Sequence, residues 1–153
     1  MSVTAVWRAL LAAFIVVCVL EPSAASASAR HDATEAGIVR AINAVRANYR
    51  LPALHTNAGL ARAADEHSAS MLRSNTLSHG AFSQRVRRYV HARRVGENLA
   101  WMSRCNADRI VRMWLNSAQH RHVMLSASFR RVGVARRASS SICFVTADFG
   151  TAS

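Results

Sequence analysis

The sequence predicts an α+β domain in which helices come first and pack on a mainly antiparallel sheet. Two observations predict this class. Apolar residues recur every three or four positions through the first two thirds of the chain, which is the period of a helix buried on one side. The last third changes to runs of β-branched and aromatic residues on either side of a serine-rich stretch, which is typical of two strands joined by a hairpin. That order of elements places helices on a sheet.

The first 29 residues are predicted to be a signal peptide. An uninterrupted apolar run of 12 residues, 9–20, is short for a bilayer span. Residues 27–29, Ala-Ser-Ala, have the small-x-small form that signal peptidase accepts. Cleavage there leaves residues 30–153 as a single domain, and a retained membrane anchor is the alternative. Lipid attachment at Cys18 is discounted, because no small residue precedes it.

The first helix of the domain is expected over residues 32–49. Its apolar positions follow steps of four, three and four residues, which puts them on one face. They are Ile38, Ile42, Val45 and Tyr49. Asp32 or Thr34 is expected to cap this helix, and Leu51-Pro52 to end it.

A second helix is expected to begin at Asn57 as N-cap and to weaken at Ser74-Asn75. Its inward face would carry Leu60, Ala64, His67 and Met71. His67 is expected to be a hydrogen-bonded residue of the core or its rim. A short helix is expected over residues 82–90, with Phe82, Val86 and Tyr89 or Val90 facing inward. Its arginines would then face water.

Residues 96–100 are interpreted as a turn followed by an apolar step. Asn106 resembles the N-cap of another helix that should stop before His120. That helix carries Ile110, Met113, Trp114 and Ser117. Trp101 and Trp114 are expected in the core, since large aromatic residues dominate burial in small domains. Strands are expected at residues 131–135 and 142–149, with a hairpin turn between them.

Two cysteines, Cys105 and Cys143, remain once the leader is removed. In an exported protein such a pair is more often bridged than free. The bridge would close a loop of nearly forty residues and stabilise the fold by ~3–4 kcal/mol. The wide spacing does not favour a metal site.

The net charge is +12, and all 20 basic residues are arginine. One interpretation is an anionic partner, such as a phospholipid surface, an acidic envelope polymer or nucleic acid. The other is a compositional bias spread over a solvated surface. Dispersion is indicated by Arg40, Arg46, Arg62, Arg73, Arg109 and Arg112. A patch is indicated by the doublets Arg87-Arg88, Arg93-Arg94, Arg130-Arg131 and Arg136-Arg137. The sequence leaves both open.

Five blocks of residues occur in a characteristic order. They are Ile42-Asn43-Ala44-Val45-Arg46 with Leu51 to Leu54, Leu60 to Met71 with Leu77-Ser78-His79, Gly96-Glu97-Asn98-Leu99-Ala100, Trp114 to Leu125, and Val132 to Ala135 with Phe149-Gly150. The order and spacing of these blocks resemble the CAP superfamily, which includes cysteine-rich secretory proteins, antigen 5 and plant pathogenesis-related proteins. The match is to its bacterial, SCP-like extracellular branch.

The resemblance implies a three-layer α-β-α sandwich with an open cleft. In many members two histidines and two acidic residues face that cleft. Position by position, the histidines fall on His79 and His120, and one acid falls on Glu97. The second acid falls at Ser117, where this chain has a hydroxyl instead.

Two imidazoles and a carboxylate are a reasonable ligand set for zinc or another divalent ion. His79 and His120, with Glu97, are therefore the metal-ligand candidates. The same residues could activate water, with Glu97 or a histidine as base. Alternatively, Glu97 accepts hydrogen bonds and holds the loops together. There is no His-Glu-x-x-His helix and no Gly-x-Ser-x-Gly elbow. No residue is firmly assigned as catalytic.

The favoured function is a secreted, non-enzymatic module that binds a lipid, a sterol, another small ligand or an anionic envelope component. No cofactor is required for that function, peripheral membrane contact is compatible with it, and a monomer is expected. The alternative is a metal-assisted hydrolase of peptide or envelope polymer that uses the same cleft. Nucleic-acid binding has only the charge in its favour, because no helix-turn-helix, zinc finger or basic ribbon interleaved with aromatics is present.

Overall fold

The computed structural model describes residues 24–152, with side chains from residue 33 onward. The predicted signal peptide therefore lies outside the described residues, except for residues 24–29, which begin the first helix, α1 (Ala24–Asn48). Because α1 has already begun at Ala24, neither Asp32 nor Thr34 is its cap, and that prediction was wrong. No helix within residues 24–152 has the length and apolar character needed to cross a membrane.

One four-stranded sheet forms the centre of the fold, in the order β1-β3-β4-β2. Its strands are β1 (His55–Thr56), β2 (Val95–Met102), β3 (Arg131–Ala138) and β4 (Cys143–Gly150). The three long strands are antiparallel neighbours, but β1 runs parallel to β3. The sheet is therefore mixed rather than mainly antiparallel, because β1 enters from the connection after α1 in the same direction as β3.

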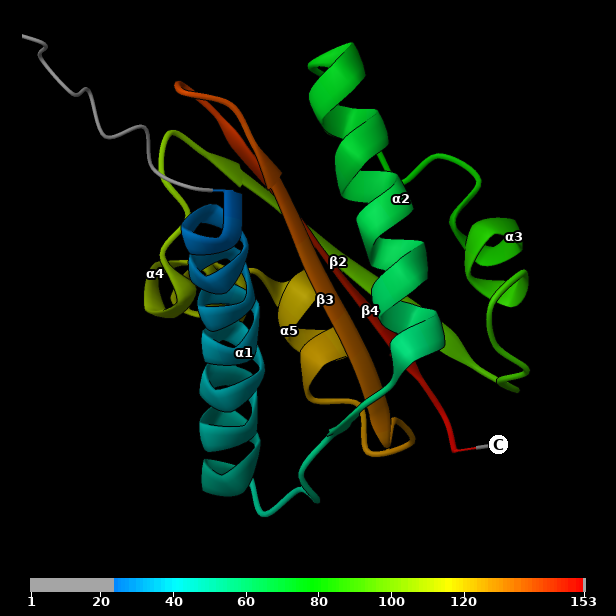
Figure 1. Ribbon diagram of the computed structural model, residues 1–153. Coiled ribbons are helices and arrows are strands. Elements are labelled where there is room, and N and C mark those ends of the chain that lie inside the picture. Colours follow the sequence, from blue (N-terminus) through cyan, green and yellow to red (C-terminus); the bar gives the residue numbers. More distant parts are fainter. Residues whose placement is uncertain (1–23, 153) are drawn as a thin grey trace, which may run out of the picture.

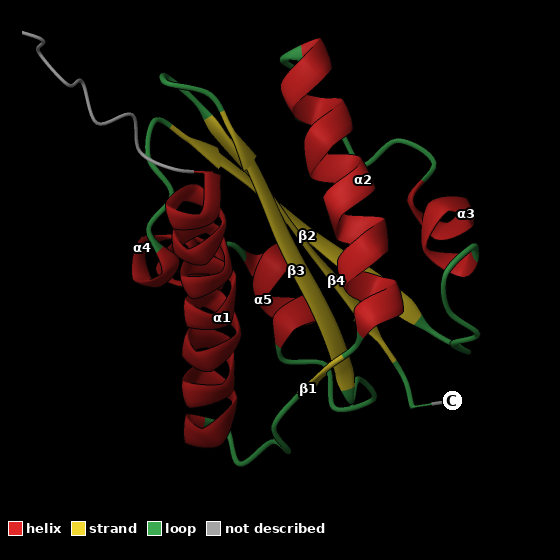
Figure 2. Ribbon diagram, viewed as in Figure 1, coloured by secondary structure: helices red, strands yellow, loops and turns green. Residues whose placement is uncertain are grey.

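Helices cover both faces of the sheet, which confirms the predicted three-layer α-β-α arrangement (Figure 1). On one side lie α1, α4 (Ala107–Asn116) and α5 (Ala118–Met124). On the other lie α2 (Ala58–Ser74) and α3 (Phe82–Arg87), as Figure 2 also shows. Strand β2 is an edge strand of this sheet.

The sequence pattern of α2 translates directly into structure. The Asn57 side chain accepts a hydrogen bond from the Leu60 N–H at 2.9 Å and so caps the helix as predicted. All four residues expected on its inward face are buried. Asn75 ends the helix in the left-handed region, with φ 49°. Gly133 of β3 lies so close to α2 that an added Cβ would collide with the backbone at Ala61.

Other local predictions need correction. Residues 96–100 belong to strand β2 and are not a turn. The sequence did not reveal this strand, because it is buried on both faces and therefore lacks an alternation of polar and apolar residues. Tyr49 is 54% exposed because α1 ends before it, and Met113 is 40% exposed. The helix that Asn106 caps does stop before His120, at Asn116, but α5 follows at once and contains His120.

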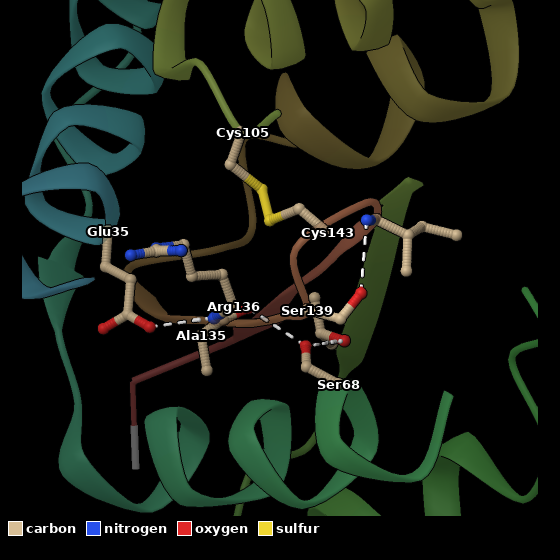
Figure 3. The surroundings of a disulfide bond; sticks show 9 residues. Glu35, Ser68, Cys105, Ala135, Arg136, Ser139 and Cys143 are labelled. Atoms are coloured by element: carbon tan, nitrogen blue, oxygen red, sulfur yellow. Dashed lines mark hydrogen bonds between the residues drawn. A yellow bond between two sulfur atoms is a disulfide. The ribbon is translucent and has the colours of Figure 1, made fainter. Parts of the chain in front are cut away.

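The predicted disulfide is confirmed between Cys105 and Cys143 (Figure 3). It joins the segment before α4 to the first residue of β4. Nearby, both helical layers bond to β3. The Glu35 carboxylate of α1 accepts from the Arg136 N–H at 2.8 Å, and the Ser68 hydroxyl of α2 donates to the Ala135 carbonyl at 3.0 Å.

Arg46 is fully buried rather than part of a dispersed surface charge. Its guanidinium donates to the carbonyl groups of Pro52 at 3.0 Å, Met124 at 2.8 Å and Ser126 at 3.1 Å. Burial, followed by the positive charge of Arg130, lowers its pKa from the usual value. Arg46 therefore holds together the ends of α1 and α5, which the apolar pattern alone could not indicate.

Candidate functional site

The site is built on a pair of acidic residues in adjacent strands. Glu97 of edge strand β2 lies directly opposite Asp148 of β4 in the antiparallel register. Both side chains are on the face covered by α2, because Leu99 and Phe144, which share their faces, pack against Met71 of α2. Glu97 is 6% exposed and Asp148 is fully buried.

Three basic side chains approach the Glu97 carboxylate. His79, from the loop after α2, lies with Nδ1 2.6 Å from Oε1. Arg85 of α3 forms an ion pair with Oε2 and also lies 3.9 Å from Asp148 Oδ1. His67 Nε2 is 3.9 Å from Oε2. The carboxylate is thus held by a histidine from the connection between α2 and α3 and by an arginine from α3 itself.

Burial dominates the protonation of these acids. It raises the pKa of Glu97, and the charge of Arg85 only partly opposes that shift. Burial, and then the negative charge of Glu97, also raise the pKa of Asp148. Two carboxyl groups this close do not both ionise readily, so the pair retains a proton at higher pH than either acid would alone.

His67 is buried and neutral at physiological pH. Its Nε2 lies 2.7 Å from the Ser78 carbonyl, to which the ring N–H donates. Burial, and then the charge of Arg85, lower its pKa to about 4. The expectation of a hydrogen-bonded residue at the rim of the core is met. Its hydrogen bond fixes the loop that carries His79.

His120 reaches the same edge strand from the other face of the sheet. Its backbone carbonyl accepts from Asn98 Nδ2 at 3.0 Å, and Asn98 is the neighbour of Glu97 in β2. Its Nδ1 is buried and has no hydrogen-bond partner among the described residues. Burial lowers the pKa of His120, and the charge of His79 lowers it further.

Ser117 is half-buried between α4 and α5, where it precedes the first residue of α5. Its side chain makes no capping hydrogen bond. The structure therefore joins His79 directly to Glu97 and holds His120 beside them through Asn98, while Ser117 has no direct contact that would define a role.

Sequence reasoning missed Arg85 and Asp148. The expectation that the arginines of residues 82–90 face water was wrong for Arg85, which is 6% exposed. Nothing in the local pattern distinguishes it from Arg87 or Arg88. Asp148 did carry a signal, since it is the one charged residue of its predicted strand, and such a residue is rarely buried without a functional or structural partner.

The donor set fits a divalent ion poorly. Within residues 24–152 no group of three or more His, Cys, Asp or Glu side chains is arranged to hold a metal. The Glu97 carboxylate is already paired with Arg85, whose positive charge would repel a second cation. Arg85 supplies the charge that a metal would otherwise bring to this carboxylate.

An apolar pocket of about 320 Å³ lies along the same face of β2. Its lining comprises Asn75, Leu77, Trp101, Ile142 and Phe144. Trp101 is 55% exposed, so the expectation of a core tryptophan was wrong, whereas Trp114 is fully buried. Leu77 is 44% exposed and stands two residues before His79.

Comparison with solved structures shows the same fold in extracellular and outer-surface proteins. An extracellular protein containing an SCP domain from Bacillus anthracis str. Ames matches with a TM-score of 0.76 and 25% identity, covering 86% of this chain and 45% of that one. The chain thus spans less than half the length of that protein. An outer surface protein from Borrelia burgdorferi matches with a TM-score of 0.72 and 22% identity, covering 79% and 94%.

A third structure, NaASP2 with Zn²⁺, matches with a TM-score of 0.58 and 12% identity, covering 76% of this chain and 78% of that one. No curated protein has significant sequence similarity to the chain. The family model of the cysteine-rich secretory protein family, CAP, matches residues 39–149. Because this match spans most of the sequence and the fold agrees, the chain belongs to the CAP family.

Proposed function

We propose that this protein is an exported, non-enzymatic module that binds a small amphipathic ligand, such as a lipid or sterol. The ligand would place a polar group at His79 and His120 and its apolar body over Leu77 and Trp101. The observation that carries the proposal is the position of one short loop. In that loop Leu77 lines an apolar pocket, and His79, two residues later, contacts a buried carboxylate.

The dimensions suit such a ligand. Glu97 and Trp101 are four residues apart in β2 and face the same side, which separates them by about 13 Å along the strand. The apolar pocket is large enough for part of an acyl chain or a ring system. The His79 side chain is 58% exposed, so a ligand hydroxyl can reach its imidazole, which favours a ligand with a polar end.

The hydrolase alternative has less support. A general base must be free to take a proton, but both oxygens of Glu97 are engaged, one by His79 and the other by Arg85. The same ion pair opposes a metal ion at this carboxylate. Proteins of similar fold are extracellular or on an outer surface, and this supports export as part of the proposal.

Binding is tested with monocaprin, an uncharged monoacylglycerol whose binding does not depend on the net charge of the protein. We expect isothermal titration calorimetry to detect binding by the purified protein and a loss of about tenfold or more in Trp101→Ser and in His79→Ala. Met113→Ser and His122→Ala are matched controls at exposed positions of α4 and α5 and should bind normally. Equal affinity in all four variants would refute the assigned site.

The same preparations separate the binding module from the hydrolase. Peptide, cell-wall and monocaprin hydrolysis are measured with and without added Zn²⁺, in the wild type and in a His79→Ala/His120→Ala double variant. Zinc-dependent turnover that the double variant lacks would establish the hydrolase instead. Export is tested by expressing the full chain in a bacterium and sequencing the N-terminus of the released protein, which should begin at Arg30.

A further inference from the structure

Three of the four arginine doublets converge at one corner of the molecule, although they are far apart in sequence. Arg87-Arg88 lie at the end of α3, Arg93-Arg94 precede β2, and Arg130-Arg131 lie at the start of β3. The Thr151 N–H donates to the Arg94 carbonyl at 3.1 Å, and the Arg130 N–H donates to the Gly150 carbonyl at 3.0 Å. Two doublets therefore flank the same residues at the end of β4, where Figure 1 also places the loop before β2.

Arg62 of α2 extends this surface. Its guanidinium lies 5.2 Å from the centroid of the Tyr89 ring, which follows directly after the first doublet. An open pocket of about 320 Å³ lies among these elements and is lined in part by Tyr89, His91, Arg131 and Thr151. We call the surface formed by Arg62, Arg87, Arg88, Arg93, Arg94, Arg130 and Arg131 the basic corner.

The positive charge of the basic corner is concentrated rather than dispersed. Six of its seven arginines are exposed. Two acids, Asp65 and Glu66, lie close to Arg62 in α2, and Glu66 pairs with Arg88 at 2.5 Å. The fourth doublet is in a different setting, because Arg137 pairs with Asp65 at 2.6 Å and the Arg136 N–H bonds to Glu35. The structure thus favours a patch over dispersed charge.

Guanidinium groups bind phosphate oxygens through two parallel hydrogen bonds, which an ammonium group cannot do. Since the chain has no lysine and the basic corner is built from arginines, it suits phosphate groups spaced along a chain. We infer that the basic corner binds a linear phosphodiester polymer without nucleobases, of the poly(glycerol phosphate) type found in bacterial envelopes. This inference does not use the cleft, and only its envelope context rests on the proposed export.

Two other anionic partners fit the basic corner less well. A bilayer surface is bound by inserting apolar side chains beside the charges. The exposed large apolar residues within residues 33–152 are Tyr49, Leu77, Trp101 and Met113, and none of them belongs to the basic corner. Single-stranded nucleic acid needs free aromatic faces for stacking. Tyr89 is already engaged, because Arg62 lies over one face of its ring and its hydroxyl bonds to Glu66 at 2.8 Å.

The test measures binding of fluorescently labelled poly(glycerol phosphate) to the purified full chain over a range of salt concentrations. We expect affinity to fall steeply with salt and to drop about tenfold or more in Arg93→Ser/Arg94→Ser. The matched control is Arg109→Ser/Arg112→Ser, which removes the same charge from exposed positions of α4 on the other side of the sheet. This control should lose less than about threefold, because it removes only long-range attraction.

Further arms identify the partner. Single-stranded DNA with the same number of phosphates, and vesicles of phosphatidylglycerol, should bind more weakly than the polymer. Tighter binding of either, or equal losses in the two double variants, would overturn the inference. His79→Ala should bind the polymer like the wild type, so that failure of the cleft proposal and failure of this one remain distinct. Matching circular dichroism spectra and melting temperatures confirm that each variant is folded. If Arg93→Ser/Arg94→Ser does not fold, the single variants Arg93→Ser and Arg94→Ser take its place.

Discussion

Glu97 and Asp148 are directly paired residues on adjacent antiparallel strands, and Arg85 lies within 4 Å of both carboxyl groups. Two acids and one guanidinium in a buried layer make the charge of this cluster dependent on pH. The expected consequences for stability and for metal binding can each be measured.

Stability should fall as the pH rises from 6.5 to 8.5. Burial raises the pKa of Asp148 to about 8 and that of Glu97 to about 7, so the folded protein keeps a proton that the unfolded chain has released. The stability that these acids contribute is fully present below the pKa values that they have in the unfolded chain. It is lost as the pH rises through the pKa values that they have in the folded protein. Asp148→Asn should flatten the dependence of melting temperature on pH, whereas Asp108→Asn, at an exposed position of α4, should not.

His67 changes stability with pH in the opposite direction, so the melting temperatures are compared only from pH 6.5 upward. Its pKa is lowered to about 4, so its contribution to stability is lost as the pH falls from about 6.5 through 4. If the melting temperature falls equally between pH 6.5 and 8.5 in the wild type and in Asp148→Asn, the acid pair is not the cause of the pH dependence.

The Arg85–Glu97 ion pair should behave as a coupled unit. Arg85→Met alone should lower the free energy of unfolding by about 3–5 kcal/mol, because it leaves buried acids without their cation. Adding Glu97→Gln should cost clearly less than the sum of the two single changes. Urea unfolding of the four proteins of this cycle gives the coupling energy, with Arg87→Met as an exposed control on α3. Strict additivity would show that the pair contributes nothing.

The same arginine should limit metal binding. We expect Arg85→Met to bind Zn²⁺ about tenfold or more tightly than the wild type, because a positive charge next to Glu97 has been removed. Calorimetric titration with zinc chloride measures the difference. Adding His79→Ala should abolish the gain. If the wild type binds zinc as tightly as the variant, Arg85 does not exclude a metal from this site.

Arg46→Lys should be strongly destabilising, by about 2–4 kcal/mol. A lysine cannot reproduce the fork of donors that reaches four carbonyl groups, so most of these acceptors would lose the hydrogen bond that Arg46 supplies. The exposed Arg40 of the same helix is the control, and Arg40→Lys should change the free energy of unfolding by less than about 0.5 kcal/mol. Chemical denaturation in urea compares the two.

Removing the disulfide should cost about 3–4 kcal/mol of stability. The bridge closes a loop of 38 residues in the unfolded chain, and its loss increases the entropy of that state. Denaturation of Cys105→Ser/Cys143→Ser, compared with the oxidised wild type, measures this cost. A reduced wild type should match the double variant, and a difference between them would indicate effects of the substitutions themselves.

The elements whose apolar and capping signals agree were predictable from the sequence. Asn57 and Asn106 cap helices as expected, and the strands of the C-terminal third formed where β-branched residues cluster. Strand β2 was missed because burial on both faces removes the alternation that identifies a strand. Arg46 and Arg85 were missed because an arginine on a helix is ordinarily solvated, and only tertiary contacts reveal the acceptors that bury it.

The candidate site was predictable only in part. The motif resemblance identified His79 and Glu97, which are in contact, and His120, which is held at the neighbouring residue of the same strand. It could not reveal Asp148, because the pairing of two strands 51 residues apart depends on register. The charge of the site therefore follows from the sheet topology as much as from the motif.

Gly133 shows how far the geometry of the site depends on a position that never touches it. The α2 backbone contacts this glycine directly, so the distance between α2 and β3 depends on the absence of a side chain at this position. A single methyl group there would lift the helix away from the strands beneath it. His67 belongs to that helix and its hydrogen bond holds the loop that carries His79. Such a shift would therefore lengthen the distance between the His79 imidazole and the Glu97 carboxylate, although every residue of the motif is unchanged.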